Sequence, residues 1–217
     1  LCRLRCAPCQ SAIVSCSTMN AENKRRYFDE LALHWDQIPA LEDTPAKIRR
    51  FVEKAVWSGA RRILDVGCGT GILLPVLLNE LPEAAHIVEL DFAERMLREN
   101  ARKFSSARVH RVCADAALVP FSADSFELVL CFGVLPHLRD IEAALAGLLV
   151  LLRPGGALCA GHLLGSRELN AFHASLSGPI VHDVLPPAEA LAEVLARLGA
   201  HVAGAEEDPG WYFVRAI

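Results

Sequence analysis

Three glycines in the stretch ILDVGCGTGI, residues 63–72, are the strongest chemical signal in the chain. Gly67, Gly69 and Gly71 directly follow an apolar run, which predicts a turn between a buried strand and a helix. Glycine allows the backbone to approach a ligand closely, and a helix N-terminus offers free amide groups with a partial positive charge. The stretch therefore predicts a binding site for a nucleotide-like small molecule.

Two carboxylates that follow later predicted strands extend this candidate site. Asp91 ends the second predicted strand, and Asp115 follows the third. A carboxylate offers two acceptor oxygens at a separation that suits the vicinal diol of a ribose. Asp91 is therefore a candidate acceptor for ribose hydroxyl groups.

An alternation of strand and helix patterns must position these residues. Apolar runs predict strands at residues 62–66, 86–90, 108–113, 126–132, 157–162, 201–205 and 211–217. Apolar residues at three-to-four spacing predict helices at residues 22–36, 72–81, 139–152 and 188–198, a helix between Thr44 and Gly59, and one that ends near residue 104. Five successive strand–helix units predict a parallel sheet with helices on both faces.

The length and composition favour one globular domain. The chain has 217 residues, of which 53% are hydrophobic and 22% charged, and single α/β domains often reach this size. Met19 has the character of a natural start, because an amphipathic helix begins just after it. We therefore expect a single domain over residues 19–217, and a tail over residues 1–18 that is disordered or not native.

Several classes of partner are disfavoured. The formal net charge of -4 argues against a general affinity for nucleic acid. No apolar run approaches the ~18 residues that a membrane span needs. The irregular spacing of His162, His173 and His182 favours scattered surface histidines over a metal site. Without a secretory signal pattern, a reducing cytoplasm is the expected location.

The eight cysteines fall into two groups. Cys68, Cys113, Cys131 and Cys159 lie singly in apolar segments, as small buried hydrophobic residues do. The spacing CxxxCxxC of Cys2, Cys6 and Cys9 resembles the cluster-binding motif of radical S-adenosylmethionine enzymes, where three thiolates hold a [4Fe–4S] cluster. In that family the motif follows a strand inside a barrel, so this interpretation remains a remote alternative.

The glycine turn itself distinguishes between two families of cofactor site. A dinucleotide-binding turn has the pattern GxGxxG, but Ile72 occupies the position of its third glycine. The glycines form GxGxG instead, with Asp65 two residues before them. This pattern resembles motif I of class I S-adenosylmethionine-dependent methyltransferases, and it disfavours a nicotinamide oxidoreductase.

Three further segments are similar to motifs of the same family, in the same order. VELDFAERML, residues 88–97, is similar to its GxDxSxxML segment, with Glu89 and Ala93 as departures. CADAALVPF, residues 113–121, with the following SFELV resembles GDAxxLPFxxxSFDxV, and LRPGG at residues 152–156 resembles the turn LKPGG. The resemblance covers about residues 22–162, and the segment GWYF at residues 210–213 resembles the family's final strand.

The resemblance implies a fold and a set of cofactor ligands. The fold is a seven-stranded, mostly parallel sheet with helices on both faces and an antiparallel closing strand. Asp91 would accept from both ribose hydroxyls, Asp115 from the adenine amino group, and the Ala116 amide would donate to an adenine ring nitrogen. The full set of implied cofactor residues is Asp65, Gly67, Cys68, Gly69, Gly71, Asp91, Phe92, Met96, Asp115, Ala116 and Phe132.

The implied reaction is an in-line displacement that moves a methyl group from S-adenosylmethionine to an acceptor and leaves S-adenosylhomocysteine. A protein promotes this reaction mainly by aligning the acceptor atom, the methyl carbon and the sulfur, and by excluding water. A general base is needed only when the acceptor must lose a proton early. His137, at a position where many relatives place a histidine, and Tyr27, on a helix that covers the cofactor in relatives, are weak catalytic candidates. Structural roles are the alternative for both.

No motif names a substrate, so a small-molecule acceptor is expected. The long segment between residues 162 and 187 is a candidate wall of the acceptor pocket, with Arg167, Asn170, His173, His182 and Asp183. A protein that binds S-adenosylmethionine without transferring its methyl group is the alternative, because the glycines, Asp91 and Asp115 would support binding in both cases.

Overall fold

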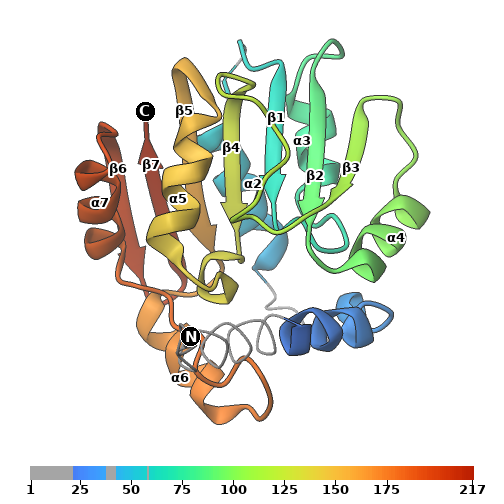
Figure 1. Ribbon diagram of the computed structural model, residues 1–217, viewed down its shortest axis with the longest axis vertical. Coiled ribbons are helices and arrows are strands. Elements are labelled where there is room, and N and C mark those ends of the chain that lie inside the picture. Colours follow the sequence, from blue (N-terminus) through green and yellow to red (C-terminus); the bar gives the residue numbers. More distant parts are fainter. Residues whose placement is uncertain (1–21, 38–42, 58) are drawn as a thin grey trace, which may run out of the picture.

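A computed structural model of the chain describes residues 22–37, 43–57 and 59–217 (Figure 1). The prediction of a tail over residues 1–18, and with it Cys2, Cys6 and Cys9, lies outside the described residues. No helix within these ranges is long and apolar enough to cross a membrane.

Seven strands form one sheet in the order β3-β2-β1-β4-β5-β7-β6. β7 pairs antiparallel with β5 and β6, and the pairs among β1 to β5 are parallel. This arrangement confirms the predicted fold with its antiparallel closing strand. The strands are β1 (Arg62–Val66), β2 (His86–Asp91), β3 (Val109–Cys113), β4 (Phe126–Phe132), β5 (Leu152–His162), β6 (Val202–Asp208) and β7 (Trp211–Ala216).

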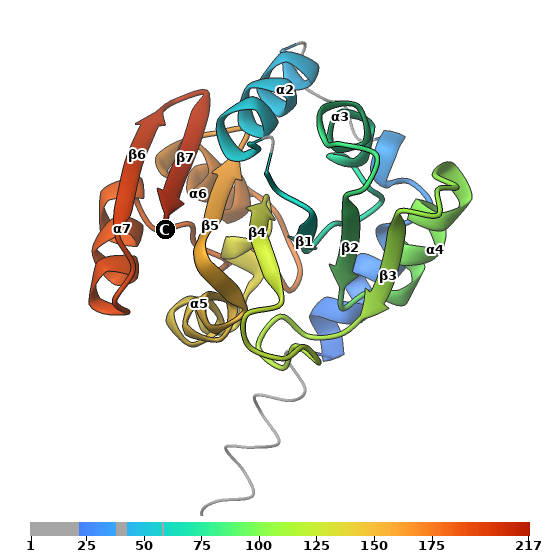
Figure 2. The same cartoon turned by 90° about the horizontal axis from the view of Figure 1, so that it is seen from above.

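Helices cover both faces of the sheet, as Figure 2 shows from above. Buried residues of α2 and α3 form one core cluster with the sheet, and those of α5 and α7 form another on the opposite face. The helices are α2 (Thr44–Ala55), α3 (Leu74–Glu80), α4 (Glu94–Lys103), α5 (Ile141–Val150), α6 (Ser166–Ser175) and α7 (Ala188–Arg197), with 3-10 turns η1 (Trp35–Gln37) and η2 (Leu135–His137).

Several predicted boundaries were wrong for identifiable reasons. The helix predicted at 139–152 begins at Ile141, because the Asp140 carboxylate accepts a hydrogen bond from the Ala143 amide and caps it. β5 begins at Leu152 rather than at residue 157, through an irregular register against β4. The predicted connection over 162–187 contains α6. Cys113 is exposed, whereas Cys68, Cys131 and Cys159 are buried.

The first helix, residues 22–31, is called here the leading helix; it ends earlier than the predicted residue 36. It lies with α6 across the carboxyl ends of β1 to β5, far from the opposite edge of the sheet (Figure 1). Phe28 and Ala32 are buried there against Ala93 and Met96 at the start of α4. The segment thus covers the edge at which the predicted site residues meet.

Candidate functional site

The glycine turn after β1 adopts a backbone conformation that favours glycine. Gly67, Gly69 and Gly71 have φ angles of 67°, 55° and 91°, in the left-handed region that side chains disfavour. The Gly67 amide donates to the Leu90 carbonyl at 2.7 Å, which ties the turn to the end of β2. A Cβ atom on Gly67 would lie 2.2 Å from Val134 Cγ2. The turn is therefore a tight cradle of exposed backbone.

Asp91 closes this cradle from the end of β2. Its Oδ2 accepts from the Gly69 amide at 2.9 Å, and its Oδ1 accepts from the Ala93 amide at 2.8 Å. Burial raises the pKa of Asp91 to about 6, although these amides oppose the shift. Each oxygen keeps a further lone pair, so the carboxylate can still accept from a ligand while it holds the turn.

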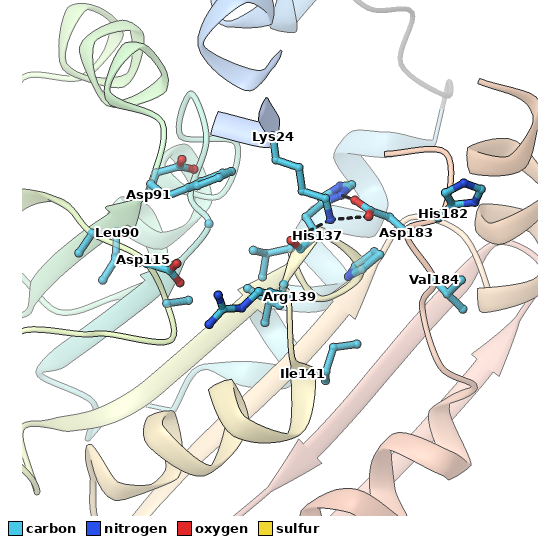
Figure 3. Close-up of a pocket in the computed structure, with 17 residues that line it drawn as sticks. Lys24, Leu90, Asp91, Asp115, His137, Arg139, Ile141, His182, Asp183 and Val184 are labelled. Carbon is cyan, nitrogen blue, oxygen red and sulfur yellow. Dashed lines mark hydrogen bonds and ion pairs between the residues drawn. The ribbon is translucent and has the colours of Figure 1, made fainter. Parts of the chain in front are cut away.

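A cavity of about 420 Å³ opens beside the turn (Figure 3). Residues from the ends of β1, β2 and β3 line one part of it: Gly67, Leu90, Asp91, Phe92, Asp115 and Ala116. The leading helix, η2 and the loop after α6 line the other part with Lys24, His137 and Asp183, among other residues. The volume lies in the range of small-molecule sites.

This geometry agrees with the comparison to known families. Residues 63–156, from β1 into β5, match the model of a methyltransferase domain. That match includes the glycine turn, Asp91 and Asp115. The matched segment is therefore similar to a methyltransferase domain, in agreement with the class I S-adenosylmethionine-dependent methyltransferase family that the motifs resemble. S-adenosylmethionine is the cofactor of this family, with S-adenosylhomocysteine as its product.

Curated relatives match the same part of this chain. The demethylmenaquinone methyltransferase of Thermus thermophilus is 37% identical over 138 residues, which cover 60% of this chain and 61% of that protein. The malonyl-[acyl-carrier protein] O-methyltransferase of Halorhodospira halophila is 35% identical over 137 residues, which cover 62% of this chain and 45% of that protein. The chain thus spans about half of the length of the curated relatives it matches.

Solved structures share the fold of this chain. A S-adenosylmethionine-dependent methyltransferase from Aquifex aeolicus superposes with a TM-score of 0.68 at 17% identity, over 85% of this chain and 97% of that chain. The [4+2]-cyclase SpnF superposes with a TM-score of 0.61 at 26% identity, over 73% of this chain and 57% of that chain. The fold therefore also serves a protein named for a different reaction.

Of the eleven residues that the sequence assigns to the cofactor, some line the cavity and others lie outside it. Gly67, Asp91, Phe92, Asp115 and Ala116 line the cavity. Gly69 and Gly71 belong to the turn but do not line it, and an added Cβ on Gly69 would approach the Trp35 indole at 4.0 Å. Met96 packs beneath the leading helix. Asp65 and Cys68 are buried behind the turn.

Phe132 does not line the cavity. Its ring packs on Phe51 of α2 with centroids 4.8 Å apart, because alternate residues of β4 face opposite sides of the sheet. Leu128, Leu130 and Phe132 belong to the cluster on the α2 side. Strand alternation therefore directs this aromatic ring into the core.

A buried polar network supports the glycine turn from behind. Asp65 and Glu89 are neighbours across β1 and β2. Glu89 Oε2 accepts from Asn100 Nδ2 at 2.7 Å, and Asn100 Oδ1 accepts from Arg111 Nε at 2.7 Å. Asp65 Oδ2 and Glu89 Oε1 have no donor among the described residues, so a proton shared between the two carboxyl groups satisfies both atoms. Burial raises the pKa of Asp65, and it raises that of Glu89 to about 7.

The network predicts a stability that falls with rising pH. Because the folded-state pKa of Glu89 lies above its unfolded value, the free energy of unfolding decreases as pH rises from about 4.5 through about 7. Glu89→Gln keeps the shape, donates to Asp65 and accepts from Asn100. We expect it to stabilise the protein by about 2 kcal/mol at pH 8 and to flatten this dependence, as measured by urea unfolding at pH 5 and pH 8.

A matched control is Glu193→Gln, which removes an exposed carboxylate on α7. We expect its free energy of unfolding to stay within about 0.5 kcal/mol of the wild type at both pH values. A loss of stability in Glu89→Gln at pH 8 would contradict the shared proton.

The second part of the cavity contains an unpredicted combination of residues. His137 Nδ1 lies 2.7 Å from Asp183 Oδ2, and Lys24 of the leading helix forms an ion pair with Asp183. Figure 3 shows all three converging from different segments. Sequence analysis missed Lys24; its signal was a lysine four residues before Phe28, on a helix face that is otherwise apolar.

The other predicted candidates lie in different surroundings. Tyr27 packs edge-to-face on Phe28 and does not line the cavity. His182 lines it, whereas His173 is buried and bonds to the Asp183 carbonyl at 2.8 Å. Asn170 bonds to the backbone of Leu185 through both its amide atoms. Among the described residues no group of histidine, cysteine and acidic side chains has the arrangement of a metal site.

Proposed function

We propose that this protein transfers the methyl group of S-adenosylmethionine to a small-molecule acceptor by in-line displacement. The observation that carries the proposal is a single cavity with two chemically different parts. Gly67, Asp91 and Asp115 form a part suited to a nucleoside and its amino-acid tail. Lys24, His137 and Asp183 form a polar part where a second molecule can approach.

The residues present fit the proposed cofactor. Only glycine fits at Gly67, so its exposed backbone can approach the ligand as no other residue would allow. Asp91, Phe92 and Asp115 line the cavity; in the proposed complex Asp91 would accept from two ribose hydroxyls, Asp115 would accept from the adenine amino group, and Phe92 would form an apolar wall. When bound, S-adenosylmethionine supplies an electrophilic methyl group on a sulfonium with a good leaving group.

The leading helix contributes the exclusion of water that alkyl transfer requires. Its Lys24 pairs with Asp183 across the cavity, and its Asp29 accepts from the Arg95 amide at 2.8 Å at the start of α4. Farther along, Asp36 accepts from the Thr70 hydroxyl at 2.7 Å, directly on the glycine turn. These contacts hold one segment over both parts of the site.

The size and charge of the site favour a small acceptor. The net charge of -4 and the cavity of about 420 Å³ are consistent with a compact ligand rather than a nucleic acid. The curated relatives are named for demethylmenaquinone and for a malonyl group on a carrier protein. Both names describe a small methyl acceptor, which is free in one case and attached to a carrier protein in the other.

Binding without methyl transfer is the second candidate. It is favoured by the similarity in fold to a [4+2]-cyclase, since function resides in the site and not in the fold. An open acceptor part beside the cofactor part supports methyl transfer instead. Formation of S-adenosylhomocysteine in the presence of an acceptor distinguishes the two.

The first experiment is a calorimetric titration of the whole chain with S-adenosylhomocysteine, with NAD as the control ligand. We expect S-adenosylhomocysteine alone to bind. Asp91→Ala should weaken binding by about 1–3 kcal/mol through the lost hydrogen bonds, and Glu83→Ala, which removes an exposed carboxylate, should leave it unchanged. Equal binding by Asp91→Ala and wild type would exclude the role given to Asp91.

The affinity should also depend on pH in a defined direction. Ribose hydroxyls donate to the ionised carboxylate, so binding lowers the pKa of Asp91 from about 6 in the free protein. The affinity for S-adenosylhomocysteine should therefore fall about tenfold between pH 7 and pH 5. Asp91→Asn should remove most of that change, and a wild-type affinity that rises toward pH 5 would contradict the assignment.

A further inference from the structure

The acceptor part of the cavity contains a histidine with a defined orientation, and its chemistry narrows the class of acceptor. This inference rests on the proposed methyl transfer. His137 Nδ1 lies 2.7 Å from Asp183 Oδ2. A carboxylate only accepts hydrogen bonds, so Nδ1 carries the proton and Nε2 keeps its lone pair. No described residue hydrogen-bonds to Nε2, and His137 lines the cavity.

Asp183 is itself held from two sides. Lys24 of the leading helix pairs with its Oδ1. The backbone carbonyl of Asp183 accepts from Nδ1 of His173, which is buried in α6. Burial raises the pKa of Asp183, but the hydrogen bonds from His137 and Lys24 outweigh it and leave the pKa below its ordinary value. The carboxylate is therefore ionised and fixed against the imidazole.

The surroundings keep His137 neutral at physiological pH. Burial lowers the pKa of His137 below its ordinary value, and the Asp183 carboxylate opposes this only in part. The other titratable groups that face it are Lys24 on the leading helix, His173 on α6 and His162 at the end of β5. All three are cationic when protonated, so they also favour the neutral ring. The Phe28 ring packs edge-to-face on the His137 imidazole, with the two ring centroids 5.0 Å apart.

We propose that the acceptor is a compound with an acidic hydroxyl, a phenol or an enol, and that His137 is the general base that takes its proton. Asp183 and Lys24 are positioning residues that hold the tautomer. A protonated hydroxyl is a poor nucleophile and gains most from a base, whereas an amine already presents a lone pair. Ile141 and Val184 line the cavity beyond His137 (Figure 3) and suit an apolar body on the acceptor.

The step balances without another reactant. The acceptor oxygen forms a bond to the methyl carbon while the bond between that carbon and sulfur breaks. The electron pair of the broken bond stays on sulfur, which becomes the thioether of S-adenosylhomocysteine. The hydroxyl proton moves to His137 Nε2 and then to solvent. The products are a methyl ether, S-adenosylhomocysteine and one proton.

The test compares two probes that differ in acidity, phenol and 4-nitrophenol, with S-adenosylmethionine as donor and S-adenosylhomocysteine formation as readout. His137→Ala should lower kcat/KM for phenol by about 10²–10⁴-fold. It should lower kcat/KM for 4-nitrophenol far less at pH 8, because this more acidic probe ionises without help. His201→Ala, which removes an exposed histidine before β6, should match the wild type.

A spectroscopic readout tests the geometry without turnover. In the complex with S-adenosylhomocysteine, ¹⁵N NMR of the labelled imidazole should show His137 protonated at Nδ1. Asp183→Asn should yield a mixture of tautomers and should shift the acid limb of the pH profile of kcat/KM to lower pH, since the carboxylate that raises the His137 pKa is gone. His137→Gln repeats the kinetic test with a side chain that leaves a smaller cavity.

Each contrary outcome is separable from failure of the proposed function. Equal losses for the two phenols, an Nε2-protonated ring in the wild type, or transfer to aniline or thiophenol in place of phenol would overturn the inference. The inference would also be overturned if the wild-type protein binds S-adenosylhomocysteine but methylates neither phenol nor 4-nitrophenol. A wild-type protein that does not bind S-adenosylhomocysteine would instead overturn the proposed function itself.

Discussion

Gly67→Ala is expected to weaken S-adenosylhomocysteine binding by about 100-fold, because the added Cβ has no room in the turn. The backbone at Gly67 has a φ of 67°, which costs an L-residue about 1–2 kcal/mol. The new Cβ would lie 2.2 Å from Val134 Cγ2, and such overpacking costs about 1–3 kcal/mol more. Relief requires the turn and the cavity wall to move apart, and calorimetry with S-adenosylhomocysteine measures the loss.

Glycine-to-alanine substitution is expected to be favourable at a helical position away from the cavity. Gly147 is exposed in α5 with no atom near the site of a Cβ, so Gly147→Ala should stabilise the protein by about 0.5–1 kcal/mol and leave binding unchanged. Adding Val134→Gly to Gly67→Ala should recover part of the affinity, because it removes both Val134 Cγ2 and Val134 Cβ, which would lie 2.2 Å and 2.5 Å from the new Cβ. Wild-type affinity in Gly67→Ala would show that the cradle does not form the cofactor site.

Phe51→Ala should lower the free energy of unfolding by about 3–5 kcal/mol. Phe51 is fully buried, and its ring lies 4.8 Å from that of Phe132 and 5.9 Å from that of Phe213. A Cβ on Gly161 would lie 2.4 Å from the same ring, so the sheet approaches it closely. Truncation leaves a cavity between α2 and the sheet that rigid strands cannot fill. Urea unfolding followed by circular dichroism measures the change.

The matched control for Phe51 is Phe172, whose side chain on α6 is 52% exposed. Phe172→Ala should change the free energy of unfolding by less than about 0.5 kcal/mol. Phe51 is absent from the cavity wall, so S-adenosylhomocysteine affinity of folded Phe51→Ala should stay within about twofold of the wild type. A small stability loss at Phe51 would mean that α2 contributes little to the core.

Sequence alone predicted that Gly67, Asp91 and Asp115 lie together, because the signals for this part of the cavity are local. Gly67, Asp91 and Asp115 each follow an apolar run, and parallel strands bring their carboxyl ends to one edge of the sheet. The order of motifs predicted the sheet and its antiparallel final strand. Phe132 shows the limit of this reasoning: it lies at the end of a strand, but alternation along β4 turns it toward α2.

Helix α6 was not predictable from apolar spacing. In SRELNAFHAS, residues 166–175, the buried side chains are Ser166, Leu169 and His173, while Phe172 is exposed. Two of the three buried residues are polar, so no apolar stripe marks the helix. Its burial depends on hydrogen bonds to distant segments, such as those from Ser166 to Glu207 on β6.

The acceptor part was decided by tertiary structure alone. His137 and Asp183 are 46 positions apart in the chain, and Lys24 and Asp183 are 159 apart. Each residue type is common on protein surfaces, and none carries a pattern that points to the others. Only the packing of the leading helix and the loop after α6 across the sheet edge brings the three side chains into contact. Local sequence therefore determined the part of the cavity that we propose for the cofactor, and long-range packing determined which side chains face the proposed acceptor part.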